Sequence, residues 1–391
     1  MQLTFDADVE AFRAEFVDFL DKNLPRESEA TQRSRSSADI PPWARHWQRV
    51  QFDAGWLLPG NPPEYGGRNA TLLEQYVHQM ELSRRRLSAS FNPQGLGIIA
   101  ASLLSFGTAA QKRDWAVPIL RAEITAALGM SEPGAGSDLA SLRTRAQRDG
   151  EDFVVNGQKI WTSGAHDADV ILTFVRTDPD APKHRGISVL LIPTDTPGVT
   201  RRPFGTLLSP NDLDFNEVFL DDVRVPAANL VGDLNQGWAV ANGSLGHERT
   251  LLWMSFAERL EDLTDDVQPT SALERDRFAT LAMDAQALRL LGSEALARAA
   301  RGEADTPSLS ALKLLGSESV QTATEWALEA AGADALAHPA RTAPESPFHH
   351  DSYGAGWFSR YAHSFAGTIA GGTSEIQRDI IAGRVLGLPR G

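Results

Sequence analysis

The pattern of hydrophobic positions changes twice along the chain. In the first part, Val9, Phe12, Phe16 and Phe19 recur at spacings of three and four residues, which predicts an amphipathic helix. The middle part contains short apolar runs separated by Pro, Gly and Asp, which are typical of strands: VILTFV, GISVLLI and EVFLDDVRV. Helical spacing returns in the last part, with small residues that permit close helix packing, at Leu281, Ala285, Leu288, Gly292, Ala295 and Ala299.

This order predicts an α+β protein with three domains. We expect a helical domain over residues 1–125, a β domain over residues 126–235 and a helical bundle over residues 236–391. A chain of 391 residues is long enough for this arrangement and for a sizeable core.

Local signals place some turns and helix ends. Asn156 and Gly157 lie between two β-rich runs and predict a hairpin with a type I′ turn. Gly332 is placed to end a helix in the left-handed conformation. In the segment GGTSEIQR near the C-terminus, Ser374 and Gln377 fit a capping box, so we expect a helix to begin there.

Charge and cysteine content exclude several classes of function. The formal net charge is −14, which argues against a general nucleic-acid surface, because binding phosphates needs clustered Lys and Arg. The chain has no cysteine, so disulfides, thiolate nucleophiles, cysteine-ligated zinc and iron–sulfur clusters are excluded. The segment His349-His350-Asp351 has no second ligand cluster beside it in the sequence, so we interpret it as a polar loop and expect no metal site.

The sequence also lacks targeting signals. It starts with the acidic segment MQLTFDADVEAF, which has neither the basic nor the apolar region of a signal peptide. No apolar run approaches the roughly 20 residues that span a bilayer. We therefore expect a cytoplasmic protein without a membrane span.

One glycine-rich segment, GMSEPGAGSD from Gly129 to Asp138, is a candidate for binding chemistry. Its glycines allow backbone N–H groups to point into one concavity that holds an anion or a flavin edge. It is not a dinucleotide fingerprint, because no apolar strand precedes Gly134 and the spacing after Gly136 does not match. It is not a nucleophile elbow, because G-x-S-x-G is absent. Taken alone, a glycine-rich segment of this kind is more often an ordinary turn that links two domains.

The complete set of motifs resembles the acyl-CoA dehydrogenase family over nearly the whole chain. The matching segments are PPEYGG, FGTAAQKRDWAVPILRAE, GMSEPGAGSD, NGQKIWTSGAHDAD, NEVFLDDVRVPAANLVGDLNQGW and GGTSEIQR. The resemblance implies an N-terminal helical domain, a middle antiparallel β domain and a C-terminal four-helix bundle. It also implies FAD between the last two domains, with part of the site from a second subunit of a homo- or heterotetramer.

The resemblance assigns site residues by position. Those implied for the flavin ring are Met130, Ser131, Trp161 and Ser163, and those implied for the CoA chain are Ser137 and Arg249. Those implied for the phosphate and adenosine side of FAD are Thr373, Glu375, Arg275, Phe278 and Glu329. Several of the latter depart from the family pattern, since Ala279 replaces a glycine, Glu375 replaces a glutamine, and the segment from Glu329 to Ala335 is eroded.

The family removes the α-proton of an acyl-CoA thioester with a carboxylate, while the β-hydrogen leaves as hydride to the flavin. Such a base must be held away from water, so that its pKa rises from about 4.3 toward neutral pH. The commonest family position for this base is occupied here by Gly371. Isovaleryl-type, long-chain and actinobacterial steroid side-chain enzymes place the base directly before an arginine on the first helix of the bundle, and Glu248 before Arg249 matches that position.

These correspondences predict the reaction and leave two alternatives. The backbone N–H of Gly371 is expected to polarise the thioester carbonyl, and its missing side chain leaves room for a branched, cyclic or bulky acyl group. Electrons would then pass to an electron-transfer flavoprotein. The alternatives are a subunit of a heteromeric dehydrogenase with little activity alone, and a flavin oxidase or monooxygenase whose substrate lacks CoA.

Overall fold

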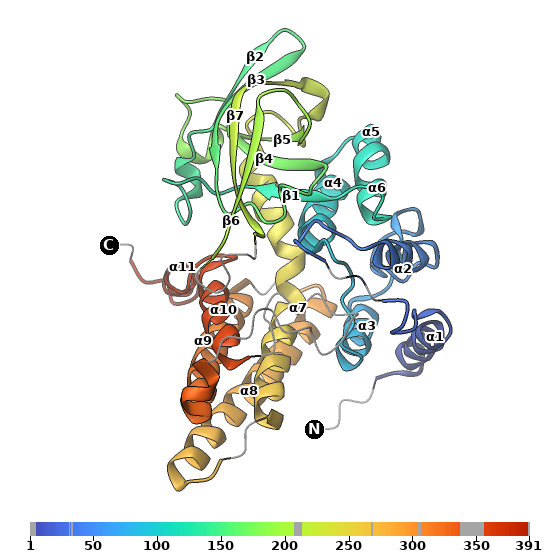
Figure 1. The fold of residues 1–391 in the computed structure, drawn as a ribbon, viewed down its shortest axis with the longest axis vertical. Coiled ribbons are helices and arrows are strands. Elements are labelled where there is room, and N and C mark those ends of the chain that lie inside the picture. Colours follow the sequence, from blue (N-terminus) through green and yellow to red (C-terminus); the bar gives the residue numbers. More distant parts are fainter. Residues whose placement is uncertain are drawn as a thin grey trace. The chain divides into compact units, whose positions relative to one another are not determined.

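The structure is a computed structural model that describes residues 5–30, 32, 34–206, 213–266, 269–303, 306–336 and 356–389. Its described residues form two compact units, which are considered separately below. Of the described residues, those up to 70 and from 84 to 246 belong to the first unit, and those from 71 to 83 and from 247 onward belong to the second. Figure 1 shows the elements of both units, coloured along the sequence.

The first unit begins with helices and continues into a sheet. The helices are α1 (Ala7–Asn23), α2 (Pro42–Asp53), α4 (Ala101–Phe106), α5 (Ala109–Gln111) and α6 (Val117–Leu120), with π turns over Gly95–Ala100 and Lys112–Ala116. The strands are β1 (Ala126–Gly129), β2 (Arg145–Asp149), β3 (Asp152–Lys159), β4 (Val170–Arg176), β5 (Ile187–Pro193), β6 (Val199–Phe204) and β7 (Phe215–Pro226). The predicted change from helices to sheet is therefore confirmed.

The sheet has the order β1-β4-β2-β3-β7-β6, and β5 pairs with β4 outside this path. Most pairings are antiparallel, as predicted, but β4 pairs in parallel with β1 and, at one residue pair, with β2. Alternate side chains of β4 belong to two different hydrophobic cores. Leu172 and Phe174 pack with residues of the N-terminal helices, whereas Ile171 and Val175 pack with other strands on the opposite face of the sheet. Burial of both faces explains why this strand appears in the sequence as a continuous apolar run.

The predicted hairpin at Asn156-Gly157 is wrong. Both residues lie inside β3, where the pairing with β7 shifts register between Val155 and Gly157. The turn that joins β2 to β3 instead contains Gly150, which has a φ of 61°. Gly157 is required for close approach, because a Cβ there would lie 2.6 Å from Thr144 Cα. Glycine in a strand interior often marks such a close approach of another backbone, and the extra residue of the register shift lies in β7.

The second unit is a helical bundle. Its helices are α3 (Leu72–Arg84), the later part of α7 (Gly237–Asp266), α8 (Ala272–Ala300), α9 (Thr306–Ala331), α10 (Trp357–Ile369) and α11 (Ser374–Ile380). Apolar residues of α7, α8 and α9 form one core, against which Trp357 of α10 packs. The predicted stripe on α8 is buried from Leu281 to Ala295, and a Cβ on Gly292 would lie 2.2 Å from the ring of Trp253. The small residues thus permit the close packing expected of them.

Two predicted helix ends have different outcomes. α9 ends at Ala331 and Gly332 has a φ of 66°, which confirms the predicted left-handed end. The predicted capping box of Ser374 is wrong, because the cap of α11 is Thr373, whose side chain accepts a hydrogen bond from Ile376 N. Ser374 is the first residue of the helix, and its buried Oγ has no partner among the described residues. Within the described ranges, no helix is long and apolar enough to cross a membrane.

Candidate active site

The glycine-rich segment and the KIWTS segment of the first unit lie side by side. Met130 and Ser131 directly follow β1. The carbonyl of Met130 accepts a hydrogen bond from Lys159 Nζ at 3.2 Å, and the carbonyl of Ser131 accepts one from Ile160 N at 3.0 Å. The structure therefore brings together the two segments that were expected to border a flavin ring.

A buried ion pair lies beneath this junction. Lys159 Nζ is 2.9 Å from Glu132 Oε1, and the Glu132 carboxylate also accepts hydrogen bonds from the backbone N–H groups of Arg143 and Thr144. Burial lowers the pKa of Lys159 to about 8, although the charge of Glu132 opposes this change. Burial alone would raise the pKa of Glu132, but the charge and hydrogen bonds of Lys159 and its other donors hold the pKa below its usual value.

The ion pair of Glu132 and Lys159 was not predicted from the sequence. Glu132 and Lys159 lie in different motifs, and the predicted turn at Asn156-Gly157 interrupted the strand that leads to the lysine. In the structure, β3 is one continuous strand in which Phe153, Val155 and Lys159 continue a single buried alternation, and the extra residue of the register shift lies in β7. A lysine at an inward position predicts a buried acid, since a buried charge is rarely left unpaired.

Trp161 and Ser163 lie in a tight turn after β3. Trp161 has a φ of 61°, in the left-handed region that a bulky residue rarely adopts, and its side chain is 56% exposed. Its indole contacts the edges of Phe204 and Phe215, with ring centroids at 5.2 Å and 5.5 Å. Ser163 is half-buried. The turn therefore presents an exposed aromatic surface from a strained backbone, a combination that is typical of functional sites.

Ser137, the residue expected near CoA, is exposed in the loop between Gly136 and the turn Leu139–Ser141. Its neighbour Asp138 accepts a hydrogen bond from the Ser141 hydroxyl, and Lys183 Nζ lies 2.9 Å from the same carboxylate. The bond from Ser141, followed by that from Lys183, lowers the pKa of Asp138. These contacts fix the conformation of the loop next to Ser137.

In the second unit, the loop before α11 is held by its backbone. Gly371 and Gly372 have φ values of 67° and 97°. Lys313 Nζ, on α9, donates to the Gly372 carbonyl at 2.7 Å, and Gln377 Nε2 donates to the carbonyls of both glycines at 3.3 Å. A Cβ on Gly371 would have no heavy atom of the described chain within 4 Å, so space for a side chain is present there.

The residues expected near the adenosine side lie on α8, α9 and α11. Arg275 is exposed on α8, and Phe278 contacts Trp326 edge-on with ring centroids 6.4 Å apart. Glu329 forms an ion pair with Arg277 at 3.0 Å. Glu375 is exposed, and hydrogen bonds from its own backbone N–H and from Thr373 lower its pKa. Phe278 and Glu329 are thus occupied by contacts within the bundle.

Glu248 and Arg249 lie in α7, and their side chains are outside the described part of the structure. The described residues contain no group of three or more His, Asp or Glu that could hold a metal ion. The segment His349-His350-Asp351 lies outside the described ranges.

Three family models match successive parts of the chain. They are described as the N-terminal, middle and C-terminal domains of acyl-CoA dehydrogenase, and they match residues 6–123, 127–223 and 235–386. The chain is 34% identical to acyl-CoA dehydrogenase IpdE1 of Mycobacterium tuberculosis over 398 residues, which cover 98% of both chains.

Two similar solved structures contain paired proteins. The structure titled "Tcur3481-Tcur3483 steroid ACAD" is 32% identical with a TM-score of 0.80, and 100% of each chain is covered. The ChsE4-ChsE5 complex from Mycobacterium tuberculosis is 30% identical with a TM-score of 0.76, again with 100% of each chain covered. These matches confirm the predicted fold of helical, β and helical domains.

Proposed function

This chain belongs to the acyl-CoA dehydrogenase family, whose members are flavin-dependent oxidoreductases that act on acyl-CoA, and we propose that it oxidises a branched, cyclic or otherwise bulky acyl-CoA to the trans-2-enoyl-CoA. The observation that carries this proposal is the junction of Met130 and Ser131 with the segment that leads into Trp161. We include in the proposal the three domains over residues 1–125, 126–235 and 236–391.

The residues of the first unit fit a flavin ring. A flat ring packs favourably on an exposed indole, and Trp161 presents one beside the half-buried hydroxyl of Ser163. In the second unit, Thr373, Glu375, Arg275, Phe278 and Glu329 are proposed for the phosphate and adenosine side. Bound FAD supplies the acceptor for the β-hydride, which no amino-acid side chain can provide.

The proposed base is Glu248, which takes the α-proton of the acyl group. The carbonyl of the thioester must be polarised as negative charge develops on it, and we assign this role to the backbone N–H of Gly371. That N–H does not depend on a side chain, so Gly371 retains this role while contributing no base. Ser137 and Arg249 are proposed to contact the CoA chain.

The shape of the acyl group follows from the same glycine. Open space surrounds the position of a Cβ on Gly371, where the common family pattern would place a glutamate. The neighbouring structure titled as a steroid ACAD supports an acyl group that carries rings. We propose a cytoplasmic enzyme that passes its electrons to an electron-transfer flavoprotein.

A direct test follows bleaching of the bound flavin without oxygen by straight, branched and ring-bearing acyl-CoAs. Glu248→Gln should slow bleaching by about 10³-fold, because it removes a general base. Glu261→Gln is a matched control, since it makes the same change in α7 at a residue that pairs with Arg289. Bleaching of Glu248→Gln at the wild-type rate would refute the assignment of the base. A strong preference for straight short chains would refute the proposed substrate class.

A second candidate is a subunit of a heteromeric dehydrogenase. It is favoured because two similar structures are named as pairs of proteins, and because the segment from Glu329 to Ala335 departs from the family pattern. Purified alone, such a subunit would lack bound FAD or turnover. A homotetramer that binds FAD and turns over acyl-CoA would exclude this candidate, and flavin content with molar mass in solution measures both properties.

A further inference from the structure

The strained turn that presents Trp161 is held to the start of β7 on both sides. Thr162 N donates to the Asn216 carbonyl at 3.2 Å, and Gly164 N donates to the Asp214 carbonyl at 2.8 Å. In return, Asn216 Nδ2 donates to the Thr162 carbonyl at 3.1 Å. These reciprocal bonds involve the residues directly before and after Ser163, so they determine where its hydroxyl and the indole of Trp161 lie.

The amide of Asn216 is fully buried, and its orientation is fixed by its acceptors. Nδ2 also lies 2.9 Å from the Asp214 carbonyl and 3.1 Å from Nδ1 of His166. Because carbonyl oxygens only accept, the NH₂ group must face them, and Oδ1 is left without a partner among the described residues. Nδ1 of His166 faces the same NH₂ group, and its Nε2 lies 3.2 Å from the Asp167 carboxylate.

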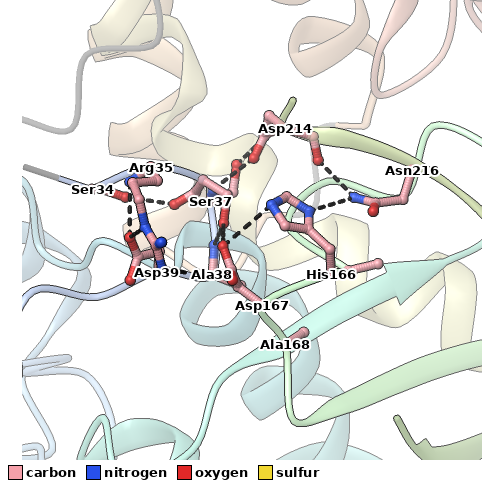
Figure 2. A network of polar contacts seen from close by, with 12 residues as sticks. Ser34, Arg35, Ser37, Ala38, Asp39, His166, Asp167, Ala168, Asp214 and Asn216 are labelled. Atoms are coloured by element: carbon pink, nitrogen blue, oxygen red, sulfur yellow. Dashed lines mark hydrogen bonds and ion pairs between the residues drawn. The ribbon is translucent and has the colours of Figure 1, made fainter. Parts of the chain in front are cut away.

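The segment from Ser36 to Ala38, which is far away in the sequence, contacts both Asp214 and the turn. The Asp214 carboxylate accepts hydrogen bonds from Ser37 N at 2.6 Å and Ser37 Oγ at 2.7 Å. A Cβ on Gly164 would lie 2.7 Å from Ala38 N, so the turn and this segment are in close contact. Figure 2 shows Asp214 between Ser37 and Asn216, with His166 beside them.

The same serine is connected to the other segment of the proposed flavin site. Asn92 Nδ2 donates to the Ser37 carbonyl at 2.8 Å and to the Ala126 carbonyl at 2.9 Å, and Ala126 N donates back to Asn92 Oδ1. Ala126 begins β1, the strand that leads directly to Met130. Ser37 therefore connects the two segments that border the proposed flavin ring: it contacts Asp214 beside the Trp161 turn, and through Asn92 it is linked to the start of β1.

We propose that Asn216, Asp214 and Ser37 are positioning residues, here called the turn clamp, which hold the Trp161–Gly164 turn in its left-handed conformation at the flavin edge. The role toward the flavin rests on the function proposed above, whereas the hydrogen bonds of the turn clamp do not. None of these side chains reacts, and they act through Trp161 and Ser163.

The test compares Asn216→Leu with Asn229→Leu, both made in the complete chain. Asn229 is a suitable control, because its Nδ2 donates to the Leu191 carbonyl in the same unit and has no described contact with the turn. Ser37→Ala is a milder second variant that removes one hydroxyl from Asp214. The measurements are the Kd for FAD, the absorption spectrum of bound flavin, the Tm, and hydrogen exchange at the amides of Thr162 and Gly164.

We expect Asn216→Leu to weaken FAD binding about tenfold, since it removes the Nδ2 hydrogen bonds to the carbonyls of Thr162 and Asp214 and so loosens the turn. It should also shift the flavin spectrum and accelerate exchange at both amides. Ser37→Ala should do the same to a smaller extent, and it decides the question if Asn216→Leu does not fold. Asn229→Leu should lower the Tm while leaving the Kd for FAD and both amides unchanged.

Two results would overturn the inference. One is unchanged exchange at Thr162 and Gly164 in Asn216→Leu and Ser37→Ala, and the other is equal weakening of FAD binding by the Asn229 control. If the wild-type chain binds no FAD, alone or with a partner chain, the proposed function and the flavin role fail together. Exchange at the two amides then still decides whether the turn clamp holds the turn.

Discussion

Two buried lysines, one in each unit, support different loops of the proposed site. Lys159 is fully buried and donates to the carbonyl of Met130, while Lys313 is 5% exposed and donates to the carbonyl of Gly372. Lys159 is also paired with Glu132, an acid from the loop that it supports. Lys313 donates to the backbone of a loop whose glycines carry no side chain, and its charge also helps to lower the pKa of Glu375 on α11.

Because of this difference, we expect the two loops to tolerate substitutions of their side chains differently. The loop after β1 supplies a buried charge to its lysine, so a change at Glu132 would leave Lys159 uncompensated. The loop before α11 is held by its carbonyls, which every residue type possesses. A carboxylate can therefore be absent at Gly371 without loss of the contact from Lys313.

The largest loss of stability is expected when the buried lysine of the first unit is replaced by methionine. Lys159→Met should lower the free energy of unfolding by about 3–5 kcal/mol, because it leaves Glu132 buried and unpaired. Urea unfolding measures the change. Lys183→Met, at a largely exposed lysine of the same unit, should cost at most about 1 kcal/mol. Equal losses for the two variants would show that burial of the ion pair is unimportant.

The ion pair should also be visible in the pH dependence of stability. The pKa of Glu132 is lower in the folded chain than its ordinary value of 4.5, so its contribution is complete above that pH. It is lost as the pH falls through the folded pKa. The advantage of the wild type over Glu132→Gln in urea unfolding should therefore shrink in acid. If the difference in unfolding free energy between the two proteins stays constant as the pH falls below 4.5, the pKa of Glu132 is not lowered in the folded chain.

In the second unit, Lys313→Met should have a smaller effect than Lys159→Met. It removes the hydrogen bond from the charged Nζ to the Gly372 carbonyl, which costs about 1.5–3 kcal/mol, while Gln377 Nε2 still donates to that carbonyl. Urea unfolding of both variants under one set of conditions compares their losses of unfolding free energy. A loss as large as that of Lys159→Met would mean that the loop before α11 depends on charge as much as the other loop does.

The smallest effect is expected at Gly371. Gly371→Ala should destabilise the chain by about 1 kcal/mol, because its positive φ disfavours a Cβ although the space is open. Gly367→Ala, inside α10, should instead stabilise by about 0.5–1 kcal/mol. Thermal unfolding compares the two signs. Destabilisation by both variants would indicate that packing, rather than φ, controls the loop.

The sequence predicted elements whose signal is local. The apolar run of β4 was recognisable because both faces of the strand are buried, and the stripe of α8 was recognisable because burial repeats at the helical period. Asn156-Gly157 misled because glycine is favoured both in a tight turn and where another backbone approaches a strand closely, and only the approach of Thr144 distinguishes the two. Ser374 misled because the neighbouring hydroxyl of Thr373 is an equally good cap.

The contacts that organise the site could not be predicted in this way. Glu132 and Lys159 are 27 residues apart, and Ser37 and Asp214 are 177 residues apart. No periodicity connects such positions, because their proximity depends on how the strands and helices pack. Family resemblance identified Trp161 and Ser163 as candidates, but it gave no indication of the residues that support them.

The left-handed backbone of Trp161 has a consequence for the evolution of this enzyme. A non-glycine residue in this conformation costs on the order of 1–3 kcal/mol. Selection for heat resistance alone would favour glycine at position 161, whereas the role proposed for Trp161 at the flavin edge requires the indole. Under that proposal, stability and catalysis make opposite demands on this position, and laboratory evolution toward thermostability should be monitored there first.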